Sequence, residues 1–203
     1  MRRYERARPG ELVHVDIKKL GKIPDGGGWR MLGRAAGSRN SQAHTSARSS
    51  ASRHPIIGYH YLHTAIDDHS RLAYSELLAD ETGTTAAAFW ARARAWFTGC
   101  GITVEAVLTD NGSCYRSGAF AAALGPAAHK RTRPYRPQTN GKVERFNRTL
   151  LEEWAYTRLY RSDTERCDTF PDWLHTYNHH RGHTALGGLP PASRVPNLTG
   201  QNS

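Results

Sequence analysis

Three acidic residues occur in sequence contexts that would suit a catalytic metal site. Asp110 follows an apolar run and precedes Asn111-Gly112, so we expect it at the carboxyl end of a buried strand, facing a crevice. Glu144 falls in the first turn of a predicted helix. Asp16 lies within residues 12–17, whose β-branched apolar residues predict a central strand. A carboxylate in a buried strand is costly unless a metal ion or a basic partner neutralises it. We therefore take these three acids as a candidate triad.

Hydrophobic periodicity indicates the elements that would position these acids. Residues 56–66 and 72–78 predict a β-hairpin, and 84–98 predict an amphipathic helix with Trp90 and Trp96 in the core. The later segments follow in order: a short helix at 117–124, a strand at 129–132, a long helix at 142–160 and another helix at 167–178. Taken alone, this order predicts only a mixed α/β fold.

Two other groups of side chains compete for a metal role. Asp67 and Asp68 fall in the turn of the predicted hairpin, where we favour side-chain capping over metal ligation. His175, His179 and His183 recur every four residues, but no cysteine or other clear fourth ligand accompanies them. No zinc is therefore expected.

The composition restricts the size of the fold and the class of partner. The 203 residues can form one good core with an appendage. Lys and Arg number 28 against 18 Asp and Glu, which gives a net charge of +10 and a pI near 9.9. Such a charge favours a polyanionic partner, and nucleic acid is the natural candidate.

The cysteines and the apolar runs bear on the compartment. Cys100, Cys114 and Cys167 are widely spaced and form no Cys-x-x-Cys pair, which indicates a reducing, intracellular setting. No apolar run approaches the roughly 18 residues of a membrane span, and no apolar segment follows the charged start to form a signal peptide. We expect a soluble, cytoplasmic protein with no membrane partner.

The motifs together resemble the catalytic part of a DDE transposase, in the retroviral-integrase-like superfamily, and are most similar to the IS481 group. The matching stretches run from about residue 10 to residue 195 and include residues 9–20, 64–71, 136–145 and Thr109-Asp110-Asn111-Gly112. The resemblance implies an α/β, ribonuclease-H-like fold: a mixed five-stranded sheet flanked by helices, with a C-terminal helical extension. It also implies that helix-turn-helix modules precede the core. There is no room for them before residue 10, so we expect a truncated or split product.

The resemblance implies metal-dependent DNA phosphodiester hydrolysis and strand transfer. Water would free a 3′-hydroxyl at the transposon end, and this hydroxyl would attack target DNA. Carboxylate ligands suit Mg²⁺, with Mn²⁺ as a substitute, and two ions about 3.5 to 4 Å apart would activate the attacking oxygen and stabilise the leaving one. Asp16 would bridge both ions, Asp110 would complete one site and Glu144 the other. We expect a homo-oligomer on DNA, associated with the nucleoid.

A loop of prolines, basic residues and amides, residues 131–141, leads directly into Glu144 and can lie along a DNA backbone. Arg148 lies four residues after Glu144 on the same helix face. By resemblance it contacts the DNA end, and a simple Glu144–Arg148 ion pair is the open alternative. The predicted DNA-binding residues are Lys18, Lys19, Arg133, Tyr135, Arg136, Gln138, Asn140, Lys142 and Arg148.

The predicted organisation is a lead-in at 1–9, an integrase-type catalytic core at 10–160, and a C-terminal helix and tail at 161–203. Within the core, residues 21–55 are rich in Gly, Ser and Arg and poor in apolar residues. Such a composition predicts an unordered basic insertion, which we favour over a flap that grips DNA phosphate. Two alternatives to an active transposase core remain. One is a truncated, non-catalytic remnant that binds DNA or pairs with a full-length transposase, and the other is a ribonuclease-H-like nuclease acting on hybrids or branched DNA.

Overall fold

A five-stranded mixed sheet forms the centre of the molecule. The computed structural model describes residues 5–43, 58–132 and 141–198. The sheet has the order β3-β2-β1-β4-β5. Strands β1 to β3 are antiparallel neighbours, whereas β4 pairs parallel with both β1 and β5. The strands are β1 Val13–Gly21, β2 Tyr59–Asp67, β3 Ala73–Leu78, β4 Ala106–Thr109 and β5 Ala128–Arg131. The expected ribonuclease-H-like arrangement of five strands is confirmed.

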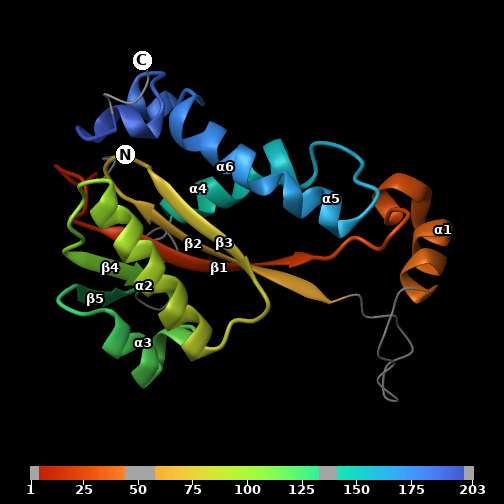
Figure 1. The fold of residues 1–203 in the computed structure, drawn as a ribbon, viewed down its shortest axis with the longest axis horizontal. Coiled ribbons are helices and arrows are strands. Elements are labelled where there is room, and N and C mark those ends of the chain that lie inside the picture. The colour runs from red at the N-terminus through yellow and green to blue at the C-terminus, as the bar shows by residue number, and fades with distance from the viewer. Residues whose placement is uncertain (1–4, 44–57, 133–140, 199–203) are drawn as a thin grey trace.

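Helices cover both faces of this sheet (Figure 1). One face carries α2 and α3, the other carries α4 and α6, and α1 lies at the far end of β1. The helices are α1 Trp29–Ala43, α2 Gly83–Gly99, α3 Gly118–Ala123, α4 Gly141–Leu150, α5 Asp163–Asp168 and α6 Phe170–His179. Shorter turns are η1 Cys114–Arg116, η3 Leu151–Ala155, η4 Thr184–Leu186 and η5 Pro191–Arg194. Among the described residues, no helix is both long and apolar enough to cross a membrane.

The alternation of side chains along the strands divides the core between the two faces. Val13 and Val15 of β1 point to the α2 side and pack in one cluster with Phe89 and Trp90. On the other side, Leu62 and Ile66 of β2 pack in a second cluster with Val143 and Phe146 of α4. The central strands β1 and β2 thus bury side chains on both faces of the sheet, including polar ones such as His14, His63 and Thr64. The prediction that Trp90 lies in the core is confirmed.

Two predicted helices differ from the observed ones at their ends. The single helix expected at 142–160 stops at Leu150 and continues as the π-turn η3, after which the Tyr160 hydroxyl donates to the carbonyl of Trp154 at 2.8 Å. The helix expected at 167–178 is instead the pair α5 and α6, separated at Thr169 and restarted with Pro171 in the first turn of α6.

The prediction that residues 21–55 would be unordered is wrong for the part that the structure describes. Helix α1 occupies residues 29–43, with a kink at Gly33, whose φ of 76° is left-handed. Polar contacts stabilise it: the Asn40 side chain donates to the carbonyls of Asp25 and Gly27 at 2.6 and 2.7 Å. Apolar periodicity could not reveal such contacts. Residues 44–55 lie outside the described part of the chain.

Candidate active site

Parallel pairing between β1 and β4 brings two of the three predicted acids to one place. His14 pairs with Leu108, and two further residues along each strand lead to Asp16 and Asp110. The two carboxylates therefore lie at equivalent positions on neighbouring strands, where β4 reaches its carboxyl end. Asp110 is exposed, whereas Asp16 is only partly accessible.

Helix α4 contacts this pair through a residue that the sequence analysis did not select. Asn147 Nδ2 donates to Asp16 Oδ2 at 3.1 Å. Glu144 precedes Asn147 by three residues, close to one helical turn, so both lie on the same side of α4. Glu144 is exposed at the start of the helix, and the contact of Asn147 with Asp16 holds its side of α4 against β1. The structure thus brings together the elements that carry all three predicted acids.

Burial and a neighbouring carboxylate shift the pKa of Asp16. Burial, and then the negative charge of Asp110, raise the pKa of Asp16 from 3.8 to about 6, and the Asn147 hydrogen bond only partly opposes this rise. A divalent cation between the carboxylates would reverse the repulsion. Carboxylate oxygens are the ligands that a hard cation such as Mg²⁺ prefers, so this pair could hold one.

The loop after β4 fixes the orientation of Asp110. The Gly112 amide donates to Asp110 Oδ1 at 2.8 Å, and Asn111 Nδ2 donates to the carbonyl of Thr132 beside β5 at 2.8 Å. A Cβ on Gly112 would lie 2.9 Å from Asp110 Oδ1, so a larger residue there would displace the carboxylate.

Tyr115 is a second residue that the sequence analysis missed. Its hydroxyl is buried and has no hydrogen-bond partner among the described residues. Burial, followed by the charges of Asp16 and Asp110, raises the pKa of this phenol well above its usual value. It remains a neutral donor close to both acids. Its place five residues after Asp110 gave no periodic signal, whereas Asn147 could have been found from its three-residue step after Glu144.

The predicted DNA-binding residues differ in their exposure and in their ion pairs. Lys19 forms an ion pair with Glu81 at 2.5 Å, and Lys142 lies 3.5 Å from Asp68, so both have acidic neighbours. Lys18 is partly buried and Arg148 is exposed. Within the described part of the chain, Glu144 and Arg148 form no ion pair, so the alternative of a simple pair is not realised. Arg133, Tyr135, Arg136, Gln138 and Asn140 lie outside the described residues.

Asp67 and Asp68 have capping and bridging roles at the hairpin turn. Asp67 accepts from the Ser70 amide and hydroxyl, both at 2.7 Å. Asp68 accepts from His14 Nε2 at 2.8 Å. Burial alone would raise the pKa of Asp68, but the hydrogen bonds from His14 and the Arg6 amide outweigh it and lower the pKa. These contacts agree with the preference for capping over metal ligation.

Comparison with known proteins agrees with this geometry. A family model described as integrase core domain matches residues 6–137, and a second model with the same description matches residues 127–191. The chain belongs to the integrase core domain family. Membership confirms the expected resemblance to transposases and integrases, while the assignment to the IS481 group stays a prediction.

The family's relatives include an insertion-element protein and viral integrases. An uncharacterised protein of insertion element IS476 from Xanthomonas euvesicatoria is 32% identical over 101 residues, covering 49% of this chain and 29% of the relative. The chain thus spans under a third of that relative's length.

Two solved structures share the fold. A chain of the simian T-cell lymphotropic virus intasome, solved with the PP2A regulatory subunit B56 gamma, superposes with a TM-score of 0.64 at 20% identity, over 95% of this chain and 56% of that one. The HTLV-2 integrase catalytic core domain, solved with magnesium in a dimeric form, superposes with a TM-score of 0.57 at 14% identity. The match covers 93% of this chain and 97% of that one.

Proposed function

We propose that the chain is the catalytic core of a transposase: a metal-dependent, DDE-type polynucleotidyl transferase and endonuclease that cuts DNA and joins a transposon end to target DNA. The observation that carries this proposal is the side-by-side placement of Asp16 and Asp110 on parallel strands, with α4 held against Asp16 by Asn147. Family membership supports the same chemistry.

Asp16, Asp110 and Glu144 would hold the divalent ions, Mg²⁺ or Mn²⁺ in its place, with two ions per site. The raised pKa of Asp16 supports this assignment, because burial and then the charge of Asp110 make the ionised carboxylate costly, and a bound cation would offset both effects. When bound, such ions supply Lewis-acid activation of the attacking oxygen and stabilisation of the leaving oxygen. Asn147 orients Asp16, and the Gly112 amide orients Asp110.

DNA is the proposed partner, both as transposon end and as target. The net charge of +10 favours binding to phosphates, and the exposed Arg148 on α4 is the best-placed basic residue beside Glu144. Because similar folds occur in an intasome and in a dimeric integrase core, we propose a homo-oligomer on DNA, in the nucleoid of the cytoplasm. The division into a 1–9 lead-in, a 10–160 core and a 161–203 extension belongs to this proposal.

The test is Mn²⁺- or Mg²⁺-dependent nicking and strand joining on DNA that carries the flanking repeats of the element. Wild type is compared with Asp110→Asn and Glu144→Gln, and DNA binding is measured in parallel by gel shift. We expect the wild type to cut and join DNA. In both variants the rate of cutting should fall at least 100-fold while DNA binding is retained.

Two other outcomes would change the conclusion. Binding without metal-dependent cutting by wild type would reject the enzyme and leave the non-catalytic remnant. Cleavage of RNA–DNA hybrids without strand joining would instead indicate a ribonuclease-H-like nuclease. Exposed Asp25, which lies beyond the end of β1 and is not a member of the triad, provides the matched control Asp25→Asn, which should keep wild-type activity.

A further inference from the structure

Three potential metal ligands of different chemistry meet away from the candidate active site. His60 lies at the start of β2, and Asp163 and Cys167 lie four residues apart on α5, so one helix face presents both to the histidine. His60 Nε2 is 2.5 Å from Asp163 Oδ2 and 3.6 Å from Cys167 Sγ, which is 4.0 Å from Asp163 Oδ2. Among the described residues, this is the group of three whose ligand atoms all lie within 4.8 Å of one another.

These separations are close to those of a tetrahedral zinc site. Zinc bonds of about 2.0 to 2.1 Å to nitrogen or oxygen and about 2.3 Å to sulfur place nitrogen and sulfur about 3.6 Å apart, and sulfur and oxygen about 3.5 Å apart. The Sγ–Nε2 distance already matches at 3.6 Å. A zinc ion would replace the His60–Asp163 hydrogen bond, and these two atoms would separate by less than about 1 Å.

The surroundings of Asp163 leave one of its oxygens for a ligand. Its Oδ1 accepts from Arg166 Nη2 at 2.7 Å and from the Ile23 amide at 3.3 Å, while Oδ2 faces His60 and Cys167. Arg166 is fully buried and also donates to the Gly21 carbonyl at 2.8 Å. Such partners behind a carboxylate are what orients a metal ligand. The His60 and Asp163 side chains are 22% and 19% exposed, so an ion can reach them.

The charges and the softness of the donors favour zinc over magnesium. An imidazole, a carboxylate and a thiolate together carry two negative charges, which balance a divalent ion. Thiolate and imidazole select zinc, whereas magnesium prefers oxygen ligands alone. The site is also separate from the triad: His60 lies four residues along β2 from Thr64, the partner of Asp16, a distance of about 13 Å.

We propose that His60, Asp163 and Cys167 bind one zinc ion, with water as the fourth ligand, and that this ion fastens α5 to the start of β2. The two elements are 103 residues apart in the sequence, so the ion would cross-link the C-terminal extension to the sheet. Figure 1 shows α5 lying between α6 and α1 at this end of the molecule. The proposal does not depend on the transposase activity.

Cobalt substitution tests the proposal directly, because Co²⁺ bound to a thiolate gives an intense charge-transfer absorption that oxygen ligands do not give. We expect one equivalent of Co²⁺ per reduced chain to produce this band. Cys167→Ser should abolish the band, and His60→Gln should reduce the affinity for Co²⁺ at least tenfold. Cys100→Ala, which leaves the cluster intact, should retain the band, as should Asp110→Asn. Absence of the band in wild type, or its persistence in Cys167→Ser, would overturn the proposal.

Zinc-dependent thermal unfolding provides a second measurement that does not rely on cobalt. In the Asp110→Asn background, Zn²⁺ at 100 times its Kd should raise the Tm by roughly 5 to 11 °C. The same zinc concentration should raise the Tm of His60→Gln in that background by no more than about half as much, because the affinity falls at least tenfold. Equal shifts in both chains would reject the site, and this comparison still decides the question if Cys167→Ser fails to fold.

Discussion

At the scale of single residues, the candidate active site places the partly buried Asp16 carboxylate next to a second negative charge, that of Asp110. Asp16 and Asp110 occupy equivalent positions on parallel strands, and burial together with the charge of Asp110 raises the pKa of Asp16 to about 6. The folded chain therefore holds a proton on Asp16 that the unfolded chain would release. It follows that this residue destabilises the metal-free fold increasingly as pH rises from about 4 to about 6.

Replacing Asp16 by Asn should therefore stabilise the metal-free chain while abolishing its metal-dependent chemistry. With chelator present, we expect Asp16→Asn to raise the free energy of unfolding by about 1 to 3 kcal/mol at pH 8 and by much less at pH 4. Urea unfolding at the two pH values measures the difference. The exposed control Asp25→Asn should show no such pH-dependent gain, and a gain at pH 4 as large as that at pH 8 would contradict the assignment.

Asn147 should matter through Asp16 alone. Because its side-chain amide orients the Asp16 carboxylate, Asn147→Ala should reduce metal affinity or cleavage rate by about 10- to 100-fold. Titration of Mn²⁺ in the cleavage assay gives the affinity. Asn40→Ala is a matched amide deletion in α1, outside the site, and should leave the metal dependence at the wild-type value. Unchanged metal dependence in Asn147→Ala would show that the hydrogen bond is dispensable.

At the scale of elements, the tight turn after β4 sets the position of the Asp110 carboxylate. A Cβ at position 112 would lie 2.9 Å from Asp110 Oδ1, so Gly112→Ala should displace Asp110 and reduce cleavage at least tenfold, with a loss of about 1 to 2 kcal/mol in stability. Gly118→Ala is the control, since nothing lies within 4 Å of the new Cβ there. Wild-type cleavage by Gly112→Ala would mean that the turn adapts without moving the carboxylate.

The strands and the acids could be predicted from the sequence because their signals are local. The β-branched run around Asp16 and the apolar run before Asp110 both formed strands. In contrast, the end of α4 and the order of α1 depend on contacts between distant segments. Arg30 lies over the ring of Tyr156 at 4.1 Å, and no window of sequence around α1 contains that partner. Asn147 has a partial sequence signal in its three-residue step after Glu144, but its contact with Asp16 exists only once α4 packs on β1. Tyr115 has no such signal, because the charges of Asp16 and Asp110 act on it only in the folded chain.

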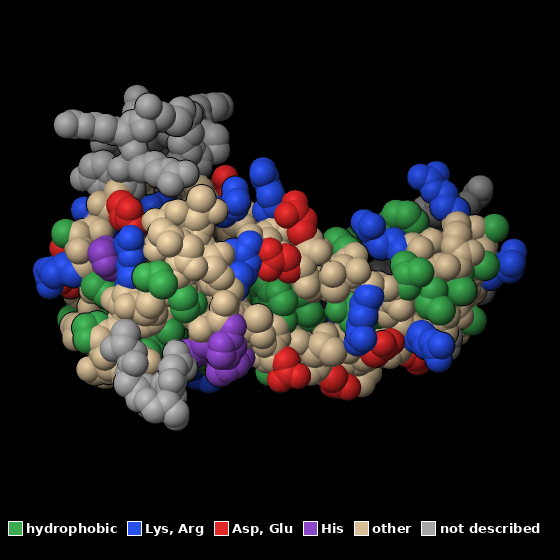
Figure 2. Space-filling view, turned by 90° about the horizontal axis from the view of Figure 1, so that it is seen from above, with side chains coloured by type: hydrophobic (Ala, Val, Ile, Leu, Met, Phe, Trp, Pro, Cys, Tyr) green, Lys and Arg blue, Asp and Glu red, His purple; other side chains and the backbone are tan. Residues whose placement is uncertain are grey.

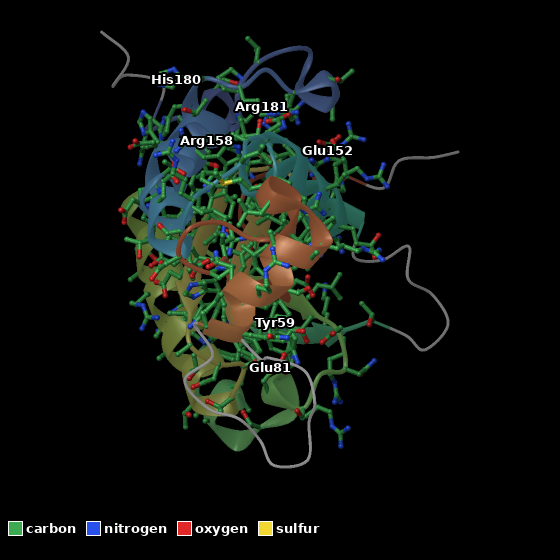
Figure 3. The ribbon with its side chains drawn as sticks, turned by 90° about the vertical axis from the view of Figure 1, so that its right-hand side faces the viewer. Tyr59, Glu81, Glu152, Arg158, His180 and Arg181 are labelled. Atoms are coloured by element: carbon green, nitrogen blue, oxygen red, sulfur yellow. The ribbon has the colours of Figure 1, made fainter. Side chains whose placement is uncertain are left out.

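At the scale of the whole molecule, positive charge is spread over several surfaces. In Figure 2, Lys and Arg side chains surround hydrophobic ones on the right-hand lobe, where α1 lies. Figure 3 places Arg158 above α1 and Tyr59 below it. Trp29 and Leu159 are also largely exposed on this part of the chain. The proposed binding of DNA would therefore have a general electrostatic contribution beyond the proposed contacts beside Glu144.

The salt dependence of DNA binding should separate these contributions. A plot of the logarithm of the DNA-binding constant against the logarithm of the salt concentration should be a straight line with a negative slope. In Arg148→Ala the line should be shallower by about 0.9, because one phosphate contact is lost. The control is Arg92→Ala, which should leave the slope unchanged. Arg92 on α2 already pairs with Glu76 on β3, since its Nε and Nη2 donate to the two carboxylate oxygens at 2.8 and 2.5 Å. Equal slopes for Arg148→Ala and wild type would exclude Arg148 from the phosphate contacts.

The position of β1 in the sheet has a consequence for how the protein is made. β1 is the first strand in the chain, yet it is central, and it pairs with β2 about 50 residues later and with β4 about 90 residues later. On the ribosome it emerges with neither neighbour available, and Asp16 meets Asn147 only after another 131 residues have been synthesised. Such distant pairings make folding slow. The proposed catalytic pair is thus assembled late, and a ribosome-bound chain that ends before α4 contains Asp16 and Asp110 but lacks Asn147 and Glu144, so the proposed site would still be incomplete.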